Sequence, residues 1–282
     1  MKIYIVIPAH NEAEFIGLTL QSLLDQTYKA ERIVVVNDQS SDATPQIVSK
    51  FERKHPSIAL ISITSSEEHL PGSKVIRAFY EGYKTLDQDY DVICKFDADL
   101  IFPINYLENL TKAFEASAKT GMFGGFCSIQ KGKSWIIENL TDKDHIRGAI
   151  KAYRKKCFLD IGGLKPAMGW DTADELLAQY HKWIIKTDKE LLVKHLKPTG
   201  TTYNKASKYK QGEAFYSLRY GFLITLIASA KLAFLKKNFN YFLDYMSGYF
   251  KAVNSKTKFL ISPDEGKFVR KLRWNKMKEK LF

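Results

Sequence analysis

Apolar residues in the first part of the chain fall into two alternating patterns. Short, nearly continuous apolar runs rich in Ile and Val predict buried strands at residues 2–8, 32–37, 58–63 and 91–96. Each run is followed by a segment with helical spacing of its apolar residues, which predicts helices at 14–26, 42–54, 73–86 and 103–119. Strands that alternate with helices in this way are typical of βαβ units. The pattern therefore predicts an α/β fold with a mainly parallel sheet and flanking helices.

After residue 121 the pattern is less regular, and near residue 200 the composition changes. We expect a strand within 121–129, loop and helix within 142–158, a helix over 172–185 and a last strand over 190–196. Residues 201–282 contain 17 Lys and Arg against 5 Asp and Glu, which accounts for the entire net charge of +12. This change predicts two domains: an α/β domain at 1–205 and a basic, amphipathic helical module at 206–282.

Cysteine use and the N-terminus bear on the compartment. Cys94, Cys127 and Cys157 are widely spaced and form no CxxC pair. They indicate neither a disulfide framework nor a zinc site, and they favour a reducing compartment. The apolar run before Pro8 is too short for the core of a signal peptide and fits a first strand better. We therefore expect a cytoplasmic protein.

Polar residues follow three of the predicted strands, at 8–12, 37–42 and 97–99. Ligands of open α/β sheets bind at the carboxyl ends of the strands, so these segments are candidates for one binding edge. Asp97 and Asp99 follow a buried strand, and two carboxylates held so close together are costly unless a cation or a ligand hydroxyl offsets their charge. Such a site suits Mg²⁺ or Mn²⁺ bound together with phosphates. The alternative is a solvated acidic turn.

Asp38 and the start of the helix at 73–86 offer groups for a nucleotide. The Asp38 carboxylate can accept hydrogen bonds from a base or a ribose hydroxyl, and Asp42 fits the role of helix cap better than Asp38 does. Lys74 and Arg77 fall in the first turns of a helix, where cations and backbone N–H groups suit phosphate. An ordinary exposed helix start is the alternative for that pair.

Two further places carry candidate chemistry. His195 is a single histidine near a strand end; it can complete an acidic metal site only if it faces Asp99, and it is otherwise structural. Asp171, Asp174 and Glu175 lie where a loop leads into a helix. Acids favour helix N-termini, and Asp171 best fits the cap. Asp174 and Glu175 then remain, and one of these carboxylates is a candidate general base.

Taken together, these segments resemble the family-2 inverting glycosyltransferases of the GT-A fold, of the bacterial cell-envelope or polysaccharide type. The resemblance covers about residues 2–200, and its motifs occur in the family's order. They are Pro8-Ala9-His10-Asn11-Glu12, the Asp38 loop to Asp42, the helix start at 72–77, Asp97-Ala98-Asp99, Gly162-Gly163 with the acids after Trp170, and the segment from His195 to Gly200.

The resemblance also implies roles for individual residues. The nucleotide would contact Pro8, Ala9, Glu12, Asp38, Lys74, Arg77 and Asp97. Asp99, Asp97 and His195 would bind Mg²⁺ or Mn²⁺. Asp174 would be the base, but Ala173 stands where the family usually has Glu, and Asp171 is the alternative.

The implied reaction is metal-dependent transfer of a sugar from a nucleoside-diphosphate sugar to a hydroxyl of a glycan or lipid-linked acceptor. UDP is the expected nucleotide because the family commonly uses it. Two other functions stay open. A sugar nucleotidyltransferase usually has a Gly-rich loop after the first strand, where this chain has residues 8–12 without glycine. An inactive, membrane-associated nucleotide-binding protein is compatible with the departure at Ala173.

The C-terminal module combines apolar, aromatic and basic residues. Its uncharged run at 220–230 has 11 residues, whereas a membrane-spanning helix needs roughly 17–25. Lys231, Lys236, Lys237 and the basic and aromatic cluster at 267–274 suit a helix lying on an anionic membrane surface. We therefore expect a peripheral protein on the inner face of the cell membrane. The alternative is a tail packed on the first domain. No nucleic-acid motif is present, so we expect no nucleic-acid partner.

Overall fold

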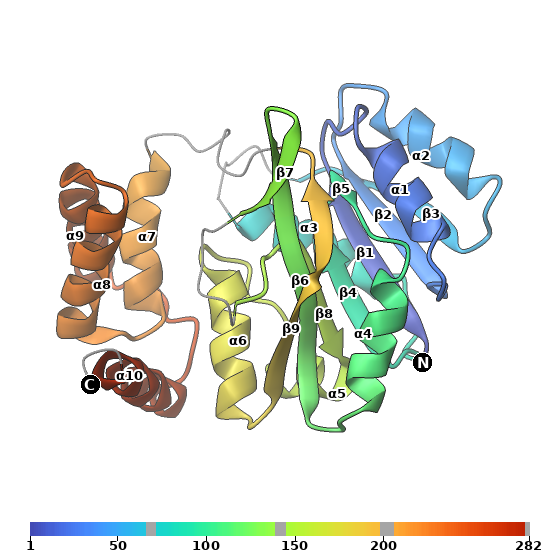
Figure 1. Ribbon diagram of the computed structural model, residues 1–282. Helices are drawn as coiled ribbons and strands as arrows, with labels where there is room; N and C mark the ends of the chain where they lie inside the picture. Colours follow the sequence, from blue (N-terminus) through green and yellow to red (C-terminus); the bar gives the residue numbers. More distant parts are fainter. Residues whose placement is uncertain (66–71, 139–144, 198–205, 280–282) are drawn as a thin grey trace.

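The structure, a computed structural model, describes residues 1–65, 72–138, 145–197 and 206–279 (Figure 1). Nine strands form one sheet in the order β3-β2-β1-β4-β8-β6-β9-β5, with β7 paired to β6. The strands are β1 Ile3–Ala9, β2 Arg32–Asp38, β3 Ile58–Ile63, β4 Val92–Phe96, β5 Leu100–Ile101, β6 Thr120–Lys131, β7 Ser134–Ile137, β8 Ile150–Arg154 and β9 Ile184–His195. The helices are α1 Ile16–Leu24, α2 Thr44–Glu52, α3 Ser73–Lys84, α4 Tyr106–Glu115, α5 Lys155–Asp160, α6 Trp170–Tyr180, α7 Ala206–Ser217, α8 Gly221–Leu235, α9 Asn240–Asn254 and α10 Pro263–Lys278.

The first half of the sheet follows the prediction. β3, β2, β1 and β4 are parallel neighbours, and the helices between them make the crossover connections. Their Ile and Val residues form the core, as expected for strands covered on both faces. Ala9 pairs with Asn37, so the carboxyl ends of β1 and β2 meet at one edge. This arrangement confirms the α/β class.

The second half of the sheet is mixed. β8 is antiparallel to β4 and β6, and β9 is parallel to β6. β8 lies within 142–158, for which loop and helix were predicted, so that prediction was wrong at 150–154; residues 142–144 lie outside the described part. The charged Lys151 interrupts the apolar pattern of this strand, so hydropathy does not predict it. In the structure the Lys151 side chain is nevertheless fully buried. The helix predicted over 172–185 ends at Tyr180, and Lys182 takes a left-handed conformation (φ 67°) before β9 begins.

The C-terminal segment is helical, as predicted, and lies beside α6 in Figure 1. α7 and α9 approach closely at two glycines. A β-carbon on Gly212 would lie 1.8 Å from the Tyr245 carbonyl oxygen, and one on Gly248 would lie 1.9 Å from that of Tyr209. Larger residues at these glycines would push the helices apart. The predicted boundary at residue 205 falls in 198–205, outside the described residues. None of the helices in the described ranges combines the length and apolarity that crossing a bilayer requires.

Candidate active site

Helix α1 fixes the backbone of the Asp97–Asp99 loop through hydrogen bonds from one side chain. The Thr19 hydroxyl donates a hydrogen bond to the Ala98 carbonyl oxygen at 2.7 Å and accepts one from the Leu100 backbone N–H at 2.9 Å. Thr19 is fully buried, so these bonds are not exchanged with water. One hydroxyl on a neighbouring helix therefore fixes the backbone on both sides of Asp99.

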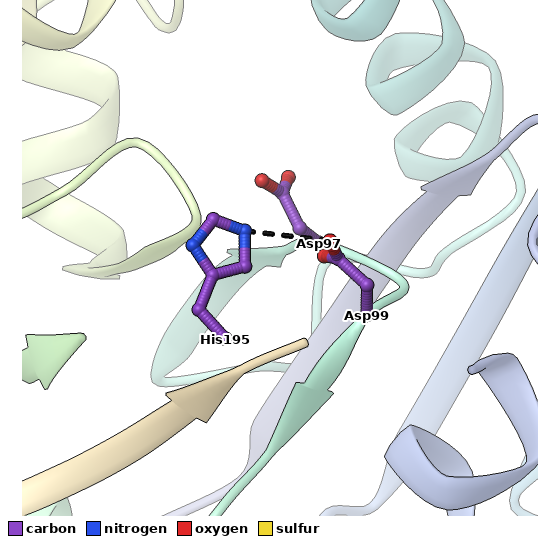
Figure 2. Close-up of side chains that lie close together, drawn as sticks. All are labelled: Asp97, Asp99 and His195. Carbon is purple, nitrogen blue, oxygen red and sulfur yellow. Dashed lines mark ion pairs between the residues drawn. The ribbon is translucent and has the colours of Figure 1, made fainter. Parts of the chain in front are cut away.

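Pairing of β5 with β9 brings His195 to the two acids. Leu100 pairs with His195, and the Leu196 N–H donates to the Asp99 carbonyl oxygen at 2.9 Å. Asp97, Asp99 and His195 each offer one ligand atom within 4.8 Å of the others, and His195 Nε2 lies 3.4 Å from Asp99 Oδ2 (Figure 2). Two carboxylates and an imidazole form a donor set that fits Mn²⁺ or Mg²⁺ completed by phosphate oxygens or water. The condition set for His195, that it face Asp99, is met.

Glu138 lies behind the imidazole and was not identified from the sequence. Its Oε2 is 3.8 Å from His195 Nδ1 and 3.2 Å from an Arg147 guanidinium nitrogen. Burial alone would lower the pKa of His195, but the neighbouring carboxylates of Asp99 and Glu138 outweigh it and raise the pKa to about 9. An imidazole must be neutral to bind a metal, so a divalent cation at this group would have to replace the proton. Glu138 faces the Nδ1 side of the ring, the side from which carboxylates commonly orient metal-binding histidines.

Candidate nucleotide residues gather at the ends of β1 and β2. Asp38 is the last residue of β2 and is 8% exposed; its Oδ1 accepts a hydrogen bond from the Ser65 N–H at 3.1 Å. His10 Nδ1 donates to the Asp38 carbonyl oxygen at 2.6 Å, which ties the two strand ends together. Pro8 and Ala9 end β1 beside β2, so the structure brings them to the same edge as Asp38.

Glu12 lies between this edge and the group formed by Asp97, Asp99 and His195. Its Oε2 is 2.6 Å from Lys197 Nζ. Burial raises the pKa of Glu12 more than Lys197 lowers it, and the charges of Asp99 and Asp97 raise it further. Lys197, whose side chain is 40% exposed, was not identified from the sequence. It places a partly exposed positive charge at this edge.

Lys74 and Arg77 lie in the first turns of α3, as predicted. Gly72 precedes them with φ 76°, and a β-carbon there would lie 2.7 Å from the Ala167 carbonyl oxygen. The start of α3 therefore adjoins the loop that leads into α6. Arg77 is exposed and Lys74 is partly buried. Within the described ranges neither forms an ion pair, so their role in phosphate binding stays a prediction.

The acids of α6 have different environments from those expected. Gly169, with φ 79°, is the residue at the N-cap, and no side chain caps it. The prediction that Asp171 caps the helix was wrong, because Asp171 lies inside the first turn. Its side chain is 35% exposed, and its Oδ2 is 3.9 Å from His145 Nε2. Asp171 is therefore the acid of this cluster that a ligand can reach.

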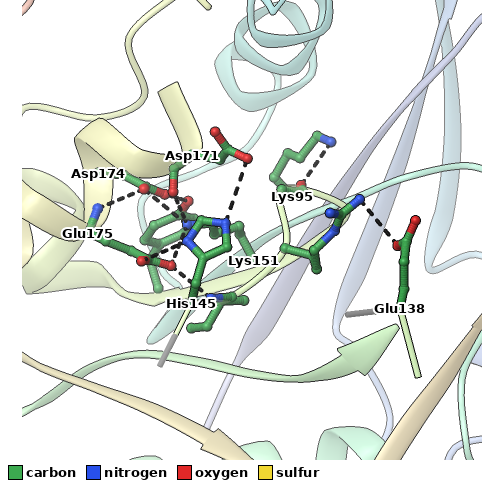
Figure 3. A network of polar contacts seen from close by, with 11 residues as sticks. Lys95, Glu138, His145, Lys151, Asp171, Asp174 and Glu175 are labelled. Carbon is green, nitrogen blue, oxygen red and sulfur yellow. Dashed lines mark hydrogen bonds and ion pairs between the residues drawn. The ribbon is translucent and has the colours of Figure 1, made fainter. Parts of the chain in front are cut away.

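Asp174 is enclosed in a buried network with Lys151 (Figure 3). Its Oδ1 lies 3.0 Å from Lys151 Nζ, its Oδ2 accepts a hydrogen bond from the Tyr153 hydroxyl at 2.5 Å, and the residue is 1% exposed. Burial and the neighbouring Glu175 raise the pKa of Asp174 to about 6, because the charge of Lys151 offsets them only in part. The Asp174 carboxylate is therefore enclosed by protein groups on both of its oxygens.

Glu175 and His145 connect this network to Asp171. Glu175 Oε1 lies 2.9 Å from Lys151 Nζ, and Glu175 Oε2 lies 2.9 Å from His145 Nδ1. Burial alone would raise the pKa of Glu175, but Lys151 and His145 lower it. Glu175 thus holds one side of the imidazole, and the other side faces Asp171. His145 had no signal in the sequence, because residues 139–149 show no clear periodicity.

Lys95 links Asp97 to the start of α6. This buried lysine forms an ion pair with Asp97, donates to the Gly148 carbonyl oxygen at 3.1 Å and lies 5.4 Å from the centre of a Trp170 ring. A β-carbon on Gly148 would lie 2.9 Å from the Trp170 ring and 3.3 Å from Asp171 Oδ2. Asp97 and Asp171 therefore belong to one region, with Gly148 between them.

Comparison with known proteins identifies the family. Residues 4–163 match the family model described as glycosyl transferase family 2. The chain belongs to this family. The match includes Asp38, Asp97 and Asp99, whereas Asp171 and His195 lie beyond it. The transferase expected from the sequence is thus confirmed as an enzyme class.

Curated relatives of this family 2 glycosyltransferase include the probable glycosyltransferase YdaM of Bacillus subtilis, 38% identical over 100 residues, which are 35% of this chain and 23% of that protein. The undecaprenyl-phosphate mannosyltransferase of Micrococcus luteus is 31% identical over 47% of this chain and 51% of its own length. The poly-β-1,6-N-acetyl-D-glucosamine synthase of Staphylococcus epidermidis is 28% identical over 59% of this chain and 41% of its own length. The chain thus spans a quarter to a half of these relatives.

Solved structures support the fold. The mannosyltransferase PcManGT from Pyrobaculum calidifontis, in complex with GDP-Man and Mn²⁺, matches with a TM-score of 0.58 at 15% identity over 95% of this chain and 78% of that chain. S. aureus TarS 1–349, in complex with UDP-GlcNAc, matches with a TM-score of 0.56 at 16% identity over 80% of this chain and 66% of that chain. The family 2 glycosyltransferase therefore has a GT-A-like α/β fold.

Proposed function

We propose that the protein is a metal-dependent inverting glycosyltransferase that uses a nucleoside-diphosphate sugar, with UDP as the expected nucleotide. The observation that carries the proposal is the convergence of Asp97, Asp99 and His195 within 4.8 Å. They lie next to the edge that presents Asp38 and in one region with Asp171. Solved neighbours contain GDP-Man with Mn²⁺ and UDP-GlcNAc, which supports a nucleotide sugar at the corresponding place.

The donor would lie along the ends of β1, β2 and β4. Pro8, Ala9 and Asp38 would surround the nucleoside, with Glu12 beside it. Lys197, Lys74 and Arg77 would contribute positive charge toward the diphosphate. Asp97, Asp99 and His195 would hold Mg²⁺ or Mn²⁺, which offsets the charge that grows on the leaving diphosphate.

We assign the general base to Asp171 in place of Asp174. Asp171 is the more accessible carboxylate, while both oxygens of Asp174 are occupied by Lys151 and Tyr153. Asp171 removes the proton of the acceptor hydroxyl while the oxygen attacks the anomeric carbon from the side opposite the diphosphate. The bond to the diphosphate breaks, its electron pair leaves with the phosphate oxygen, and the anomeric centre inverts. His145, held by Glu175, orients Asp171.

The acceptor is proposed to be a hydroxyl of a glycan or of a lipid-linked sugar. Two relatives named above carry a polysaccharide synthase name and an undecaprenyl-phosphate mannosyltransferase name, which supports this class. Lipid-linked acceptors lie at the membrane, so we propose a peripheral protein on the inner face of the cell membrane.

Release of the nucleotide tests this function. UDP-sugars and GDP-sugars are incubated with the protein, a divalent cation and a glycolipid extract, and free nucleoside diphosphate is measured. We expect acceptor-dependent release that stops on chelation and is absent in Asp99→Ala. Pyrophosphate-dependent formation of the nucleoside triphosphate and a sugar phosphate from the same donors would instead indicate a nucleotidyltransferase. Undiminished release by Asp99→Ala would overturn the metal assignment.

A further inference from the structure

Exposed apolar side chains are concentrated on α8 and α9. Among the residues that the structure describes, nine of the eighteen large exposed apolar residues come from residues 221–254 alone. We call them the α8–α9 surface: Phe222, Leu223, Ile227, Phe234, Leu235, Phe239, Leu243, Phe250 and Val253. Soluble monomers rarely expose apolar patches beyond a few hundred Å² unless the patch binds something.

Helical spacing places these residues in stripes on the two helices. Leu223, Ile227 and Phe234 recur at intervals of four and seven residues, which puts them on one side of α8. Phe239, Leu243 and Phe250 recur in the same way at the start of and along α9. The rings of Phe222 and Phe250 lie 6.1 Å apart, so the two stripes adjoin.

Other side chains of the same helices supply the packing within the module. Ile224 and Ala233 of α8 are buried, as are Tyr245 and Tyr249 of α9, and α9 packs closely on α7. The exposed stripes are therefore additional to the core of the module. A helix that is apolar on nearly all sides is normally covered by protein or by membrane.

The turn between the helices is the most exposed part of the surface. Phe234 is 83% exposed, Leu235 is 63% and Phe239 is 68%, and Lys236 and Lys237 lie between them. Aromatic and apolar residues next to lysines are typical of segments that enter the boundary between lipid headgroups and acyl chains.

The net charge of residues 221–258 indicates which partner covers the α8–α9 surface. Residues 221–258 contain six lysines, at 231, 236, 237, 251, 256 and 258, and one acid, Asp244, which gives a net charge of +5. A second copy of the chain would bring the same positive charge and repel. An anionic bilayer complements both the apolar residues and the lysines.

We propose that the α8–α9 surface docks on an anionic lipid bilayer, with the turn at Phe234–Phe239 inserted at the headgroup level. This proposal deepens the proposed function, because docking would bring the active site to lipid-linked acceptors. The proposal also leaves the cluster at 267–274 out of the membrane-binding surface that the sequence predicted. The cluster at 267–274 lies on α10, where Val269 is buried and Phe268 packs against Tyr180 with ring centres 5.6 Å apart.

Vesicle binding by the full chain tests the docking. Sedimentation with phosphatidylglycerol-containing vesicles is compared with sedimentation on pure phosphatidylcholine vesicles. The triple variant Phe234→Ser, Leu235→Ser and Phe239→Ser removes the apolar turn. The matched control is Ile104→Ser with Leu159→Ser, two exposed apolar residues of the α/β domain.

We expect wild type and control to bind anionic vesicles, and the triple variant to bind at least about tenfold more weakly. Lys231→Gln with Lys237→Gln should weaken binding about tenfold or more at low salt. Equal binding by the triple variant, or no binding by wild type, would overturn the proposal. So would a dimer in solution that the triple variant dissociates. Asp99→Ala should dock like wild type, so failure of docking is distinguishable from failure of the proposed reaction.

Discussion

Replacing Asp171 by Asn should reduce sugar transfer about 10²–10⁴-fold. The amide keeps the shape of the side chain but cannot take the proton of the acceptor hydroxyl. Because Asp171 is partly exposed and contributes no cap to α6, the variant should melt close to the temperature of the wild type. The measurement is turnover with the acceptor extract, normalised to the folded fraction.

Asp174→Asn is the matched control, because it makes the same chemical change three positions further along the same helix. Asp174 lies in the buried network, so its replacement should change the melting temperature and leave turnover per folded molecule near the wild-type value. The opposite result, an active Asp171→Asn and a folded but inactive Asp174→Asn, would return the role of base to Asp174.

Replacing Lys151 by Met should destabilise the fold by about 3–5 kcal/mol, because it leaves two buried carboxylates without their cation. Lys151 is 0% exposed and lies 3.0 Å from Asp174 and 2.9 Å from Glu175. Chemical denaturation gives the free energy of unfolding. Lys84→Met, which removes an exposed pair with Glu81, is the control and should change it by less than about 1 kcal/mol.

The Lys151→Met variant should also respond to pH. Without the lysine, burial raises the folded pKa values of both carboxyls above their unfolded values. Groups of this kind stabilise the fold at low pH and lose that contribution as pH rises through the folded pKa. The deficit should therefore shrink as pH falls from 8 toward 5, and adding Asp174→Asn should recover part of it. A deficit that grows on acidification would contradict the assigned network.

The sequence could predict the parts of the site that end regular strands. Asp38, Asp97 and Asp99 follow buried apolar runs, and the geometry of parallel sheets brings such ends together. His195 could be suggested but not placed, because its approach to Asp99 depends on the pairing of β5 with β9. That pairing is a contact between distant segments, and local periodicity carries no information about it.

Buried lysines explain why the sequence did not predict strand β8 or the environment of Asp174. Lys95 and Lys151 lie inside the protein, although lysine is almost never fully buried unless it is paired. The charge of Lys151 made strand β8 unpredictable from hydropathy. Its pairing with Asp174, which allows that acid to be buried, was equally unpredictable. The proposed choice of Asp171 over Asp174 rests on which of the two carboxylates faces Lys151, and this cannot be seen in the sequence.

In the proposed reaction, Asp97, Asp99 and His195 hold a divalent cation that binds the diphosphate of the donor. Calorimetric titration of UDP, with GDP as the comparison nucleotide, into wild type and Asp99→Ala with and without Mn²⁺ tests it most directly. We predict that Mn²⁺ strengthens binding of the preferred nucleotide to wild type and has no such effect in Asp99→Ala. Binding that is indifferent to Mn²⁺, or an Mn²⁺ effect that survives in Asp99→Ala, would contradict the account.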